Sequence, residues 1–292
     1  MNIANIEQLM FVGMDYQSYF LLKEGFKPVI RVATSKELIE EFKKICKNLG
    51  LSVLVKEFSE IYGTKLEKAS FNAYISNSKE SAEEAYEVER GGDRKTFGKL
   101  LGYPACCVDK FIENLKSPVD YTIQTFLNTK TNPSFYCNFI FNFDSKLDDG
   151  GIKIYQENYR IFNKTKLYFL IRHMSCSFDC KKSIEIGKKT LEILNREMPQ
   201  LAESIVHALK RPVLYLDYFN WLVFNGEING NELVYKEVLL YDSLFPKEKL
   251  ELIKRGNVVK VFDEKIQVLK DENILLEIPK KDRYKGVLID FI

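Results

Sequence analysis

The first 78 residues alternate between β-rich runs and one amphipathic stretch. Runs rich in β-branched and aromatic side chains predict three short strands, at residues 27–33, 51–58 and 71–76. Between the first two, Thr34 and Glu37 have the spacing of a capping box, which predicts a helix that ends near Gly50. This strand–helix–strand order favours a small α/β unit.

From residue 78 onward, apolar residues recur with a helical period. The predicted helices cover residues 78–90, 93–101, 105–115 and 119–128, then a long stretch after Cys180, and finally 199–210. Gly91-Gly92 and Gly102 separate the first three helices, and Pro104 suits the first turn of the third. Two runs of alternating or continuous apolar residues, 135–143 and 166–171, predict strands within this helical middle.

After Pro212 the pattern is β-rich, and Asn-Gly pairs within it indicate hairpins. We therefore expect three parts: an N-terminal α/β unit (1–78), a helix-rich core (79–211) and a mostly antiparallel β domain (212–292). The predicted fold class is α/β, or α+β for the chain as a whole.

Composition and charge narrow the classes of protein that the chain can be. Of its 292 residues, 46% are apolar and 29% charged, which excludes a disordered chain. The net charge of +2 is close to neutral, whereas an obligate nucleic-acid binder has an overall excess of basic residues. We see neither an apolar run of about 18 residues, as a membrane span needs, nor a secretory signal, so we expect a cytoplasmic protein with reduced thiols.

Four of the six cysteines fall into two local pairs, Cys106 with Cys107 and Cys176 with Cys180. Each pair is expected at the N-terminal turn of a helix, where backbone N–H groups favour the thiolate over the thiol. A thiolate binds metal ions or attacks an electrophile, so both pairs are candidate functional residues. Cys46 and Cys137 fit ordinary core positions instead.

The spacing within each pair sets a condition on its geometry. Cys176 and Cys180 lie on one face if their helix reaches back to Cys176, and His173, three residues earlier, could join them as a metal ligand. Adjacent helical side chains diverge by about 100°, so we expect Cys106 and Cys107 to serve one site only if the helix begins at or after them.

The segment Gly102-Tyr103-Pro104-Ala105-Cys106-Cys107-Val108, which follows Leu101, resembles the LGYPxCCV element of a largely archaeal family known as domain of unknown function 483. The segment from His173 to Cys180, with Ser183, is similar to that family's second element, although Met174-Ser175 replaces its usual residue-proline pair. The resemblance covers roughly residues 90–190. It implies that the two cysteine pairs belong together, and it supplies no reaction.

The leading hypothesis is a metal or iron–sulfur site held by Cys106, Cys107, Cys176 and Cys180, with His173 as a further ligand or proton carrier. In an iron–sulfur or metal-dependent lyase, or an enzyme of sulfur chemistry, Cys106, Cys180 and His173 would be catalytic. Tyr103, Ser175 and Ser177 flank the cysteines and are expected to contact the cofactor. The substrate would be a small or anionic molecule.

Three alternatives stay open. A metal-free cysteine nucleophile or thiol-redox enzyme would use the same thiols. A non-enzymatic module with structural zinc could bind a partner or RNA, with nucleic acid less favoured; its basic surface would comprise Arg94, Lys95, Lys99, Arg172, Lys181, Lys182, Lys188 and Lys189. The cysteines could also be buried core residues without a chemical role.

Overall fold

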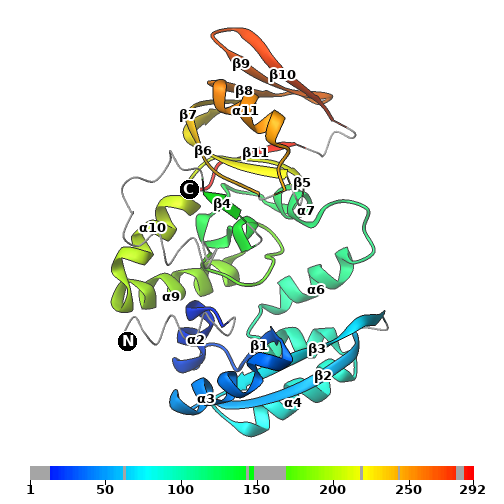
Figure 1. Cartoon of the computed structure of the whole chain (residues 1–292). Helices are drawn as coiled ribbons and strands as arrows, with labels where there is room; N and C mark the ends of the chain where they lie inside the picture. Colours follow the sequence, from blue (N-terminus) through cyan, green and yellow to red (C-terminus); the bar gives the residue numbers. More distant parts are fainter. Residues whose placement is uncertain are drawn as a thin grey trace. The chain divides into compact units, whose positions relative to one another are not determined.

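The computed structural model describes residues 14–61, 64–142, 145–147, 169–217, 220–242, 244–280 and 286–292. The chain forms two compact units, Met1–Leu115 and Lys116–Ile292. The predicted mixed α/β class is confirmed, with helices in the middle of the chain and a β-rich C-terminal region (Figure 1). The division into three domains stays a prediction.

The first unit contains a three-stranded antiparallel sheet in the order β1-β3-β2. Its strands are β1 (Val29–Thr34), β2 (Ser52–Ile61) and β3 (Thr64–Ser76), which confirms the three predicted strands. Helix α4 (Lys79–Arg90) packs on the face that carries Val29 and Tyr74 (Figure 1), where Ala82 and Ala85 complete the core.

The helix between β1 and β2 begins differently from the prediction. A 3-10 turn at Lys36–Leu38 leads into α3 (Ile39–Asn48), and Ser35, not Thr34, precedes it without a capping side-chain bond. The capping box is wrong because β1 continues through Thr34, which pairs with Phe71 in the sheet. The predicted end at Gly50 is confirmed: its φ of +67° is a conformation that favours glycine. Helix α2 (Tyr16–Lys23), capped by Asp15, precedes β1.

Two short helices complete the first unit, α5 (Arg94–Leu100) and α6 (Ala105–Asn114), both as predicted. Between them Gly102 has a φ of +76°, and the Tyr103 amide donates to the carbonyl of Gly98. This is the hydrogen bond of a Schellman turn, which ends α5 and reverses the chain into α6.

The second unit begins with helix α7 (Tyr121–Asn128) and continues, after a gap in the described residues, with α9 (Lys181–Glu197) and α10 (Pro199–Leu209). These helices confirm the predicted ones. The strand predicted at 135–143 is wrong, because Phe135–Cys137 and Ile140–Asn142 form 3-10 turns. Every residue from Cys137 to Phe141 is buried, so the run packs on all sides rather than on one face of a sheet.

Of the strand predicted at 166–171, residues 166–168 lie outside the described part. Phe169, Leu170 and Ile171 are buried but belong to no strand. The periodicity of so short an apolar run does not show whether the run forms a strand or a buried loop.

The C-terminal part is an antiparallel sheet in the order β10-β9-β8-β7-β6-β5-β11, to which β4 (Ser145–Leu147) adds through β7. The strands are β5 (Val213–Asp217), β6 (Asn220–Asn229), β7 (Glu232–Asp242), β8 (Val258–Val261), β9 (Lys265–Lys270), β10 (Asn273–Pro279) and β11 (Val287–Ile289). The predicted β-rich character of this region is confirmed.

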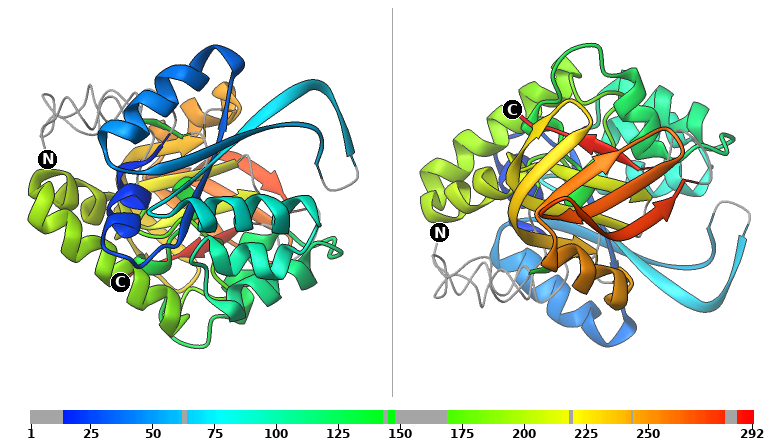
Figure 2. Two further views of the ribbon diagram at one scale, coloured as in Figure 1. Left: turned by 90° about the horizontal axis from the view of Figure 1, so that it is seen from below. Right: turned by 90° about the horizontal axis from the view of Figure 1, so that it is seen from above.

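The Asn-Gly pairs have two different structural roles. Gly230, with a φ of +66°, makes the hairpin turn from β6 to β7, as its pair with Asn229 predicts. Gly226 instead lies inside β6 at an irregularity in the ladder. Helix α11 (Lys247–Arg255), which the sequence reading missed, packs on the sheet through Leu250 and Ile253 (Figure 2). In the part of the chain that the structure describes, no helix has the length and apolar character to cross a membrane.

Candidate metal centre

The first cysteine pair occupies the first turn of α6. This helix begins at Ala105, so it starts before the pair, contrary to the condition expected from the sequence. The Sγ atoms of Cys106 and Cys107 are nevertheless 4.0 Å apart. Cys106 is exposed and Cys107 is buried. The two adjacent thiols can therefore face one ion although both belong to a regular helix.

Two glycines fix the position of this turn. A Cβ on Gly98 would lie 2.7 Å from a methyl group of Val108, so α5 and α6 cross at a distance that only glycine permits. A Cβ on Gly102 would lie 3.4 Å from the Cα of Lys27, so the turn before the pair packs closely on the segment entering β1.

The second pair lies at the start of α9 but not within it. The helix begins at Lys181, which makes Cys180 its N-cap and leaves Cys176 in the preceding loop. The condition that the helix reaches back to Cys176 is therefore not met. The loop closes on itself instead: the Cys180 amide donates to the Ser177 carbonyl over 3.3 Å. Cys176 is half-buried and Cys180 is buried.

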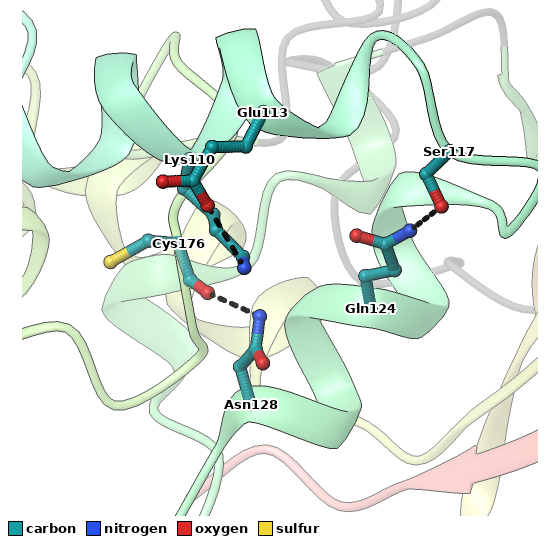
Figure 3. Close-up of polar contacts among 6 residues, drawn as sticks. All are labelled: Lys110, Glu113, Ser117, Gln124, Asn128 and Cys176. Carbon is teal, nitrogen blue, oxygen red and sulfur yellow. Dashed lines mark hydrogen bonds and ion pairs between the residues drawn. The ribbon is translucent and has the colours of Figure 1, made fainter.

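A polar stripe on α7 holds the loop of Cys176 in place. Thr125 Oγ1 donates to the Ser175 carbonyl over 3.1 Å, and Asn128 Nδ2 donates to the Cys176 carbonyl over 3.4 Å (Figure 3). The Tyr121 hydroxyl reaches the Met174 carbonyl over 3.4 Å. In Figure 3 the sulfur of Cys176 points away from the Asn128 bond, so this bond holds the backbone of Cys176 and not its thiol.

Sequence reasoning missed this stripe, although a signal was present. Tyr121, Thr125 and Asn128 are spaced i, i+4 and i+7, and therefore share one helix face. Thr129 extends the face and accepts a hydrogen bond from the Phe178 amide at 2.9 Å. A polar face on a helix otherwise expected to be buried indicates a polar partner.

Asp179 fastens the other side of the loop. Its Oδ2 accepts hydrogen bonds from the amides of Lys130 and Thr131 at 3.0 and 3.1 Å, and its Oδ1 accepts one from Ser177 Oγ at 2.6 Å. Partial burial alone would raise the pKa of Asp179, but these hydrogen bonds outweigh it and lower the pKa below the usual aspartate value.

The start of α7 is in turn fixed to the C-terminal sheet. The Tyr215 hydroxyl on β5 donates to the Asp120 carboxylate at 3.0 Å, and Asp120 caps α7 by accepting from the amide of Thr122 at 2.8 Å. Burial, followed by the charge of Asp120, raises the pKa of Tyr215. Gln124 donates to Ser117 Oγ and anchors the segment before α7 (Figure 3). The β-rich region therefore helps to position the second cysteine pair.

The remaining predicted site residues have separate environments. His173 is buried, with Nε2 at 2.8 Å from Ser183 Oγ. The hydroxyl of Ser175 is buried without a hydrogen-bond partner among the described residues. Ser177 is bonded to Asp179, as above, and the ring of Tyr103 lies beneath Lys27 Nζ, 5.2 Å from the ring centroid. Their roles as cofactor contacts or catalytic groups stay predictions.

Cys46 and Cys137 are fully buried, as expected of core cysteines. Burial raises the pKa of Cys46 to about 12. It also raises the pKa of Cys137, whose Sγ donates to the Cys180 carbonyl at 3.7 Å. Neither thiol is suited to act as a thiolate at neutral pH.

Several residues of the predicted basic surface interact within the protein. Lys95 pairs with Asp109 at 2.7 Å, and Lys189 with Glu192 at 2.9 Å. Lys188 lies over the ring of Tyr136.

Cys106, Cys107, Cys176 and Cys180 form a group that could hold a metal ion. His173 is not part of this group. Helices α4, α5 and α7 are capped by the side chains of Ser78, Asp93 and Asp120, whereas α6 and α9 have no side-chain cap. The cysteines thus lie at helix N-termini, where the helix dipole favours negative charge.

Comparisons with known proteins found no match among curated proteins and none among solved structures. Residues 75–203 match the model of a family described as a protein of unknown function, DUF483. This segment includes both cysteine pairs, α7 and the loop that α7 holds. The resemblance predicted from the two cysteine elements is thus confirmed: over residues 75–203, the chain matches the DUF483 family.

Proposed function

We propose that this protein binds one metal ion, zinc, through the thiolates of Cys106, Cys107, Cys176 and Cys180. The observation that carries the proposal is the 4.0 Å separation of the Cys106 and Cys107 sulfur atoms. Tetrahedral zinc with Zn–S bonds of about 2.3 Å places its sulfur ligands ~3.8 Å apart. The sulfur atoms of adjacent cysteines rarely lie this close together, but those of Cys106 and Cys107 do.

The spacing of the sulfur atoms within each cysteine pair favours a single ion over a four-iron cluster. In a four-iron cluster each cysteine binds its own iron, so the cysteine sulfur atoms are separated by much more than the edge of one tetrahedron. Within each cysteine pair the sulfur atoms lie no more than 4.8 Å apart, which is close to that edge. A mononuclear centre therefore fits this arrangement with less rearrangement of the chain.

The charges around the cysteines support an anionic centre. Four thiolates and one divalent ion carry a net charge of −2, which the uncapped N-termini of α6 and α9 would stabilise. Lys181 and Lys182 occupy the first turn of α9, where a helix dipole disfavours cations by about 0.3–1 kcal/mol each. An anionic centre at Cys180 would offset that cost.

A zinc ion with four protein ligands has no position for substrate, so the proposed role of the centre is structural. A second candidate is the iron–sulfur or metal-dependent enzyme, favoured by the exposure of Cys106. An exposed ligand could yield its position to a substrate, with the metal then acting as a Lewis acid. In that case the buried His173 would be the proton carrier.

Metal and acid-labile sulfide analysis of protein purified without oxygen tests the proposal. We expect about one zinc per chain from four thiolate ligands, no sulfide and no visible colour. Cys180→Ser should lose the ion, and Cys46→Ser should keep it. Iron with stoichiometric sulfide would favour the cluster-bearing enzyme instead, and the absence of any metal would overturn both candidates.

A further inference from the structure

Phe178 lies in the loop between the two cysteines of the second pair, Cys176 and Cys180, and its side chain is fully buried. Its ring stacks on the ring of Phe139, with centroids 5.4 Å apart and an interplanar angle of 25°. The ring of Phe291 meets it edge-on, with centroids 5.0 Å apart and an angle of 89°. Both arrangements are favourable for aromatic pairs, so the two neighbours hold the Phe178 side chain in one orientation.

A short segment after α7 connects the backbone of this loop to Ile292. The Ser134 amide donates to the Phe178 carbonyl over 2.8 Å. The neighbours of Ser134 bond to Ile292 instead: the Ile292 amide donates to the Pro133 carbonyl over 3.0 Å, and the Phe135 amide donates to the Ile292 carbonyl over 3.2 Å. Backbone hydrogen bonds therefore join Ile292, through this segment, to the middle of the cysteine loop.

The conformation of this loop decides whether both of its cysteines can reach one metal ion. Cys176 precedes α9 and Cys180 is the N-cap of that helix, so helical geometry does not fix their relative positions. A loop that is already held in the binding conformation loses less conformational entropy when the ion binds, and its affinity is higher. Phe178 is two residues from each cysteine, so its contacts restrain both of them.

We propose that Phe291 and Ile292 are positioning residues for the metal centre, because their contacts with Phe178 and with residues 133–135 hold the second cysteine pair in the conformation that binds metal. This inference rests on the proposed function. It extends the centre beyond residues 75–203, which match the family model, to residues that follow β11. Coupling between two sites is reciprocal, so metal binding should in turn stabilise the contacts of residues 291 and 292.

The zinc affinity of Phe291→Ala tests the ring contact in the 292-residue protein. We expect the affinity, measured in competition with a chelator, to fall about tenfold, and Phe291→Leu, which keeps most of the apolar volume, to stay within about threefold of wild type. Phe245→Ala is the matched control, because Phe245 is another buried phenylalanine but packs in the sheet core with Leu250 and Ile253. This control should lose stability and keep its zinc affinity within about threefold of wild type.

Hydrogen exchange in the wild-type protein tests the same coupling without a substitution. The Ile292 amide, which donates to Pro133, should exchange about tenfold more slowly in zinc-loaded than in zinc-free protein. The Phe262 amide is the control, because it donates to the Lys265 carbonyl over 2.8 Å in an exposed turn between β8 and β9. It should exchange at the same rate in both states.

An exchange rate of the Ile292 amide that does not depend on zinc would overturn the inference, as would a Phe291→Ala protein with wild-type zinc affinity. Equal losses of affinity in Phe291→Ala and Phe245→Ala would also overturn it, because they would reflect stability alone. If Phe291→Ala does not fold, the exchange measurement decides. Wild-type protein that binds no zinc would refute the proposed function, and this inference with it, whereas the other outcomes leave zinc binding by the wild type intact.

Discussion

Thr125 Oγ1 donates a hydrogen bond to the carbonyl oxygen of Ser175, 3.1 Å away and 50 residues later in the chain. This bond joins α7 to the loop that carries Cys176. The same hydroxyl also contacts the Tyr121 carbonyl within its own helix, at 2.9 Å. One threonine thus connects the helix that is fixed to the C-terminal sheet with the residue immediately before a proposed metal ligand.

Replacing Thr125 by valine keeps the shape of the side chain and leaves the Ser175 carbonyl without this donor. We expect a loss of about 1–2 kcal/mol in the free energy of unfolding, together with weaker metal binding. Thr190→Val is the matched control, because Thr190 is a buried helical threonine whose hydroxyl bonds, among the residues that the structure describes, to the Ile186 carbonyl alone. Urea denaturation measures the stability of both variants, and titration with metal measures their affinity. Equal losses of stability and of affinity in the two variants would contradict the assigned role of Thr125.

Asp179→Asn tests the second attachment of the cysteine loop. The substitution keeps the size of the side chain but weakens charge-assisted hydrogen bonds from Lys130, Thr131 and Ser177. We expect stability at neutral pH to fall by about 1–3 kcal/mol. Asp263→Asn, in an exposed turn, should change it by less than about 0.5 kcal/mol. Thermal unfolding measures the stability of both variants. An Asp179→Asn protein with wild-type stability would contradict the role of Asp179 in holding the cysteine loop.

Gly98→Ala should disturb the first cysteine pair from a distance. The added methyl group would lie 2.7 Å from Val108, one residue after Cys107, so α6 must shift. We expect a destabilisation of about 1–3 kcal/mol and weaker metal binding. The double variant Gly98→Ala/Val108→Ala should recover part of both losses, because it removes the clashing methyl groups. Additive effects of the two substitutions would show that the contact does not set the position of α6.

Cys46 should be chemically inert in the folded protein. Its pKa of about 12 keeps it protonated up to strongly alkaline pH, whereas an ordinary thiol with a pKa of about 8.5 is largely thiolate at pH 9. Alkylation by iodoacetamide at pH 9, followed by mass analysis of peptides, should label Cys46 only after denaturation. Rapid labelling in the native protein would mean that this thiol is accessible and that Cys46→Ser is an unsuitable control.

The parts of the fold that follow from local rules were predictable from the sequence. Asp93, Gly102 and Pro104 define the ends of α5 and the start of α6 through capping and turn chemistry. The strand predicted at 135–143 is wrong because residues 137–141 are all buried, without the alternation of a strand, and tertiary packing alone determines this burial. The amphipathic pattern of α11 was overlooked among the surrounding strands.

The candidate site likewise has features that follow from the local sequence and features that depend on tertiary contacts. Clustering along the chain identified the two cysteine pairs, because each pair is local in sequence. The polar face of α7 indicates a polar partner, but the contacts of Thr125 and Asn128 with the cysteine loop span about 50 residues, so the pattern does not identify that partner.

X-ray absorption at the metal edge of the purified 292-residue protein distinguishes a mononuclear four-thiolate centre from a cluster. We expect one ion per chain with four sulfur ligands at about 2.3 Å and no second metal in its neighbourhood. Cys107→Ser should reduce the sulfur count or abolish metal binding. A metal–metal scattering component, or a shell dominated by nitrogen and oxygen ligands, would contradict a four-thiolate mononuclear centre.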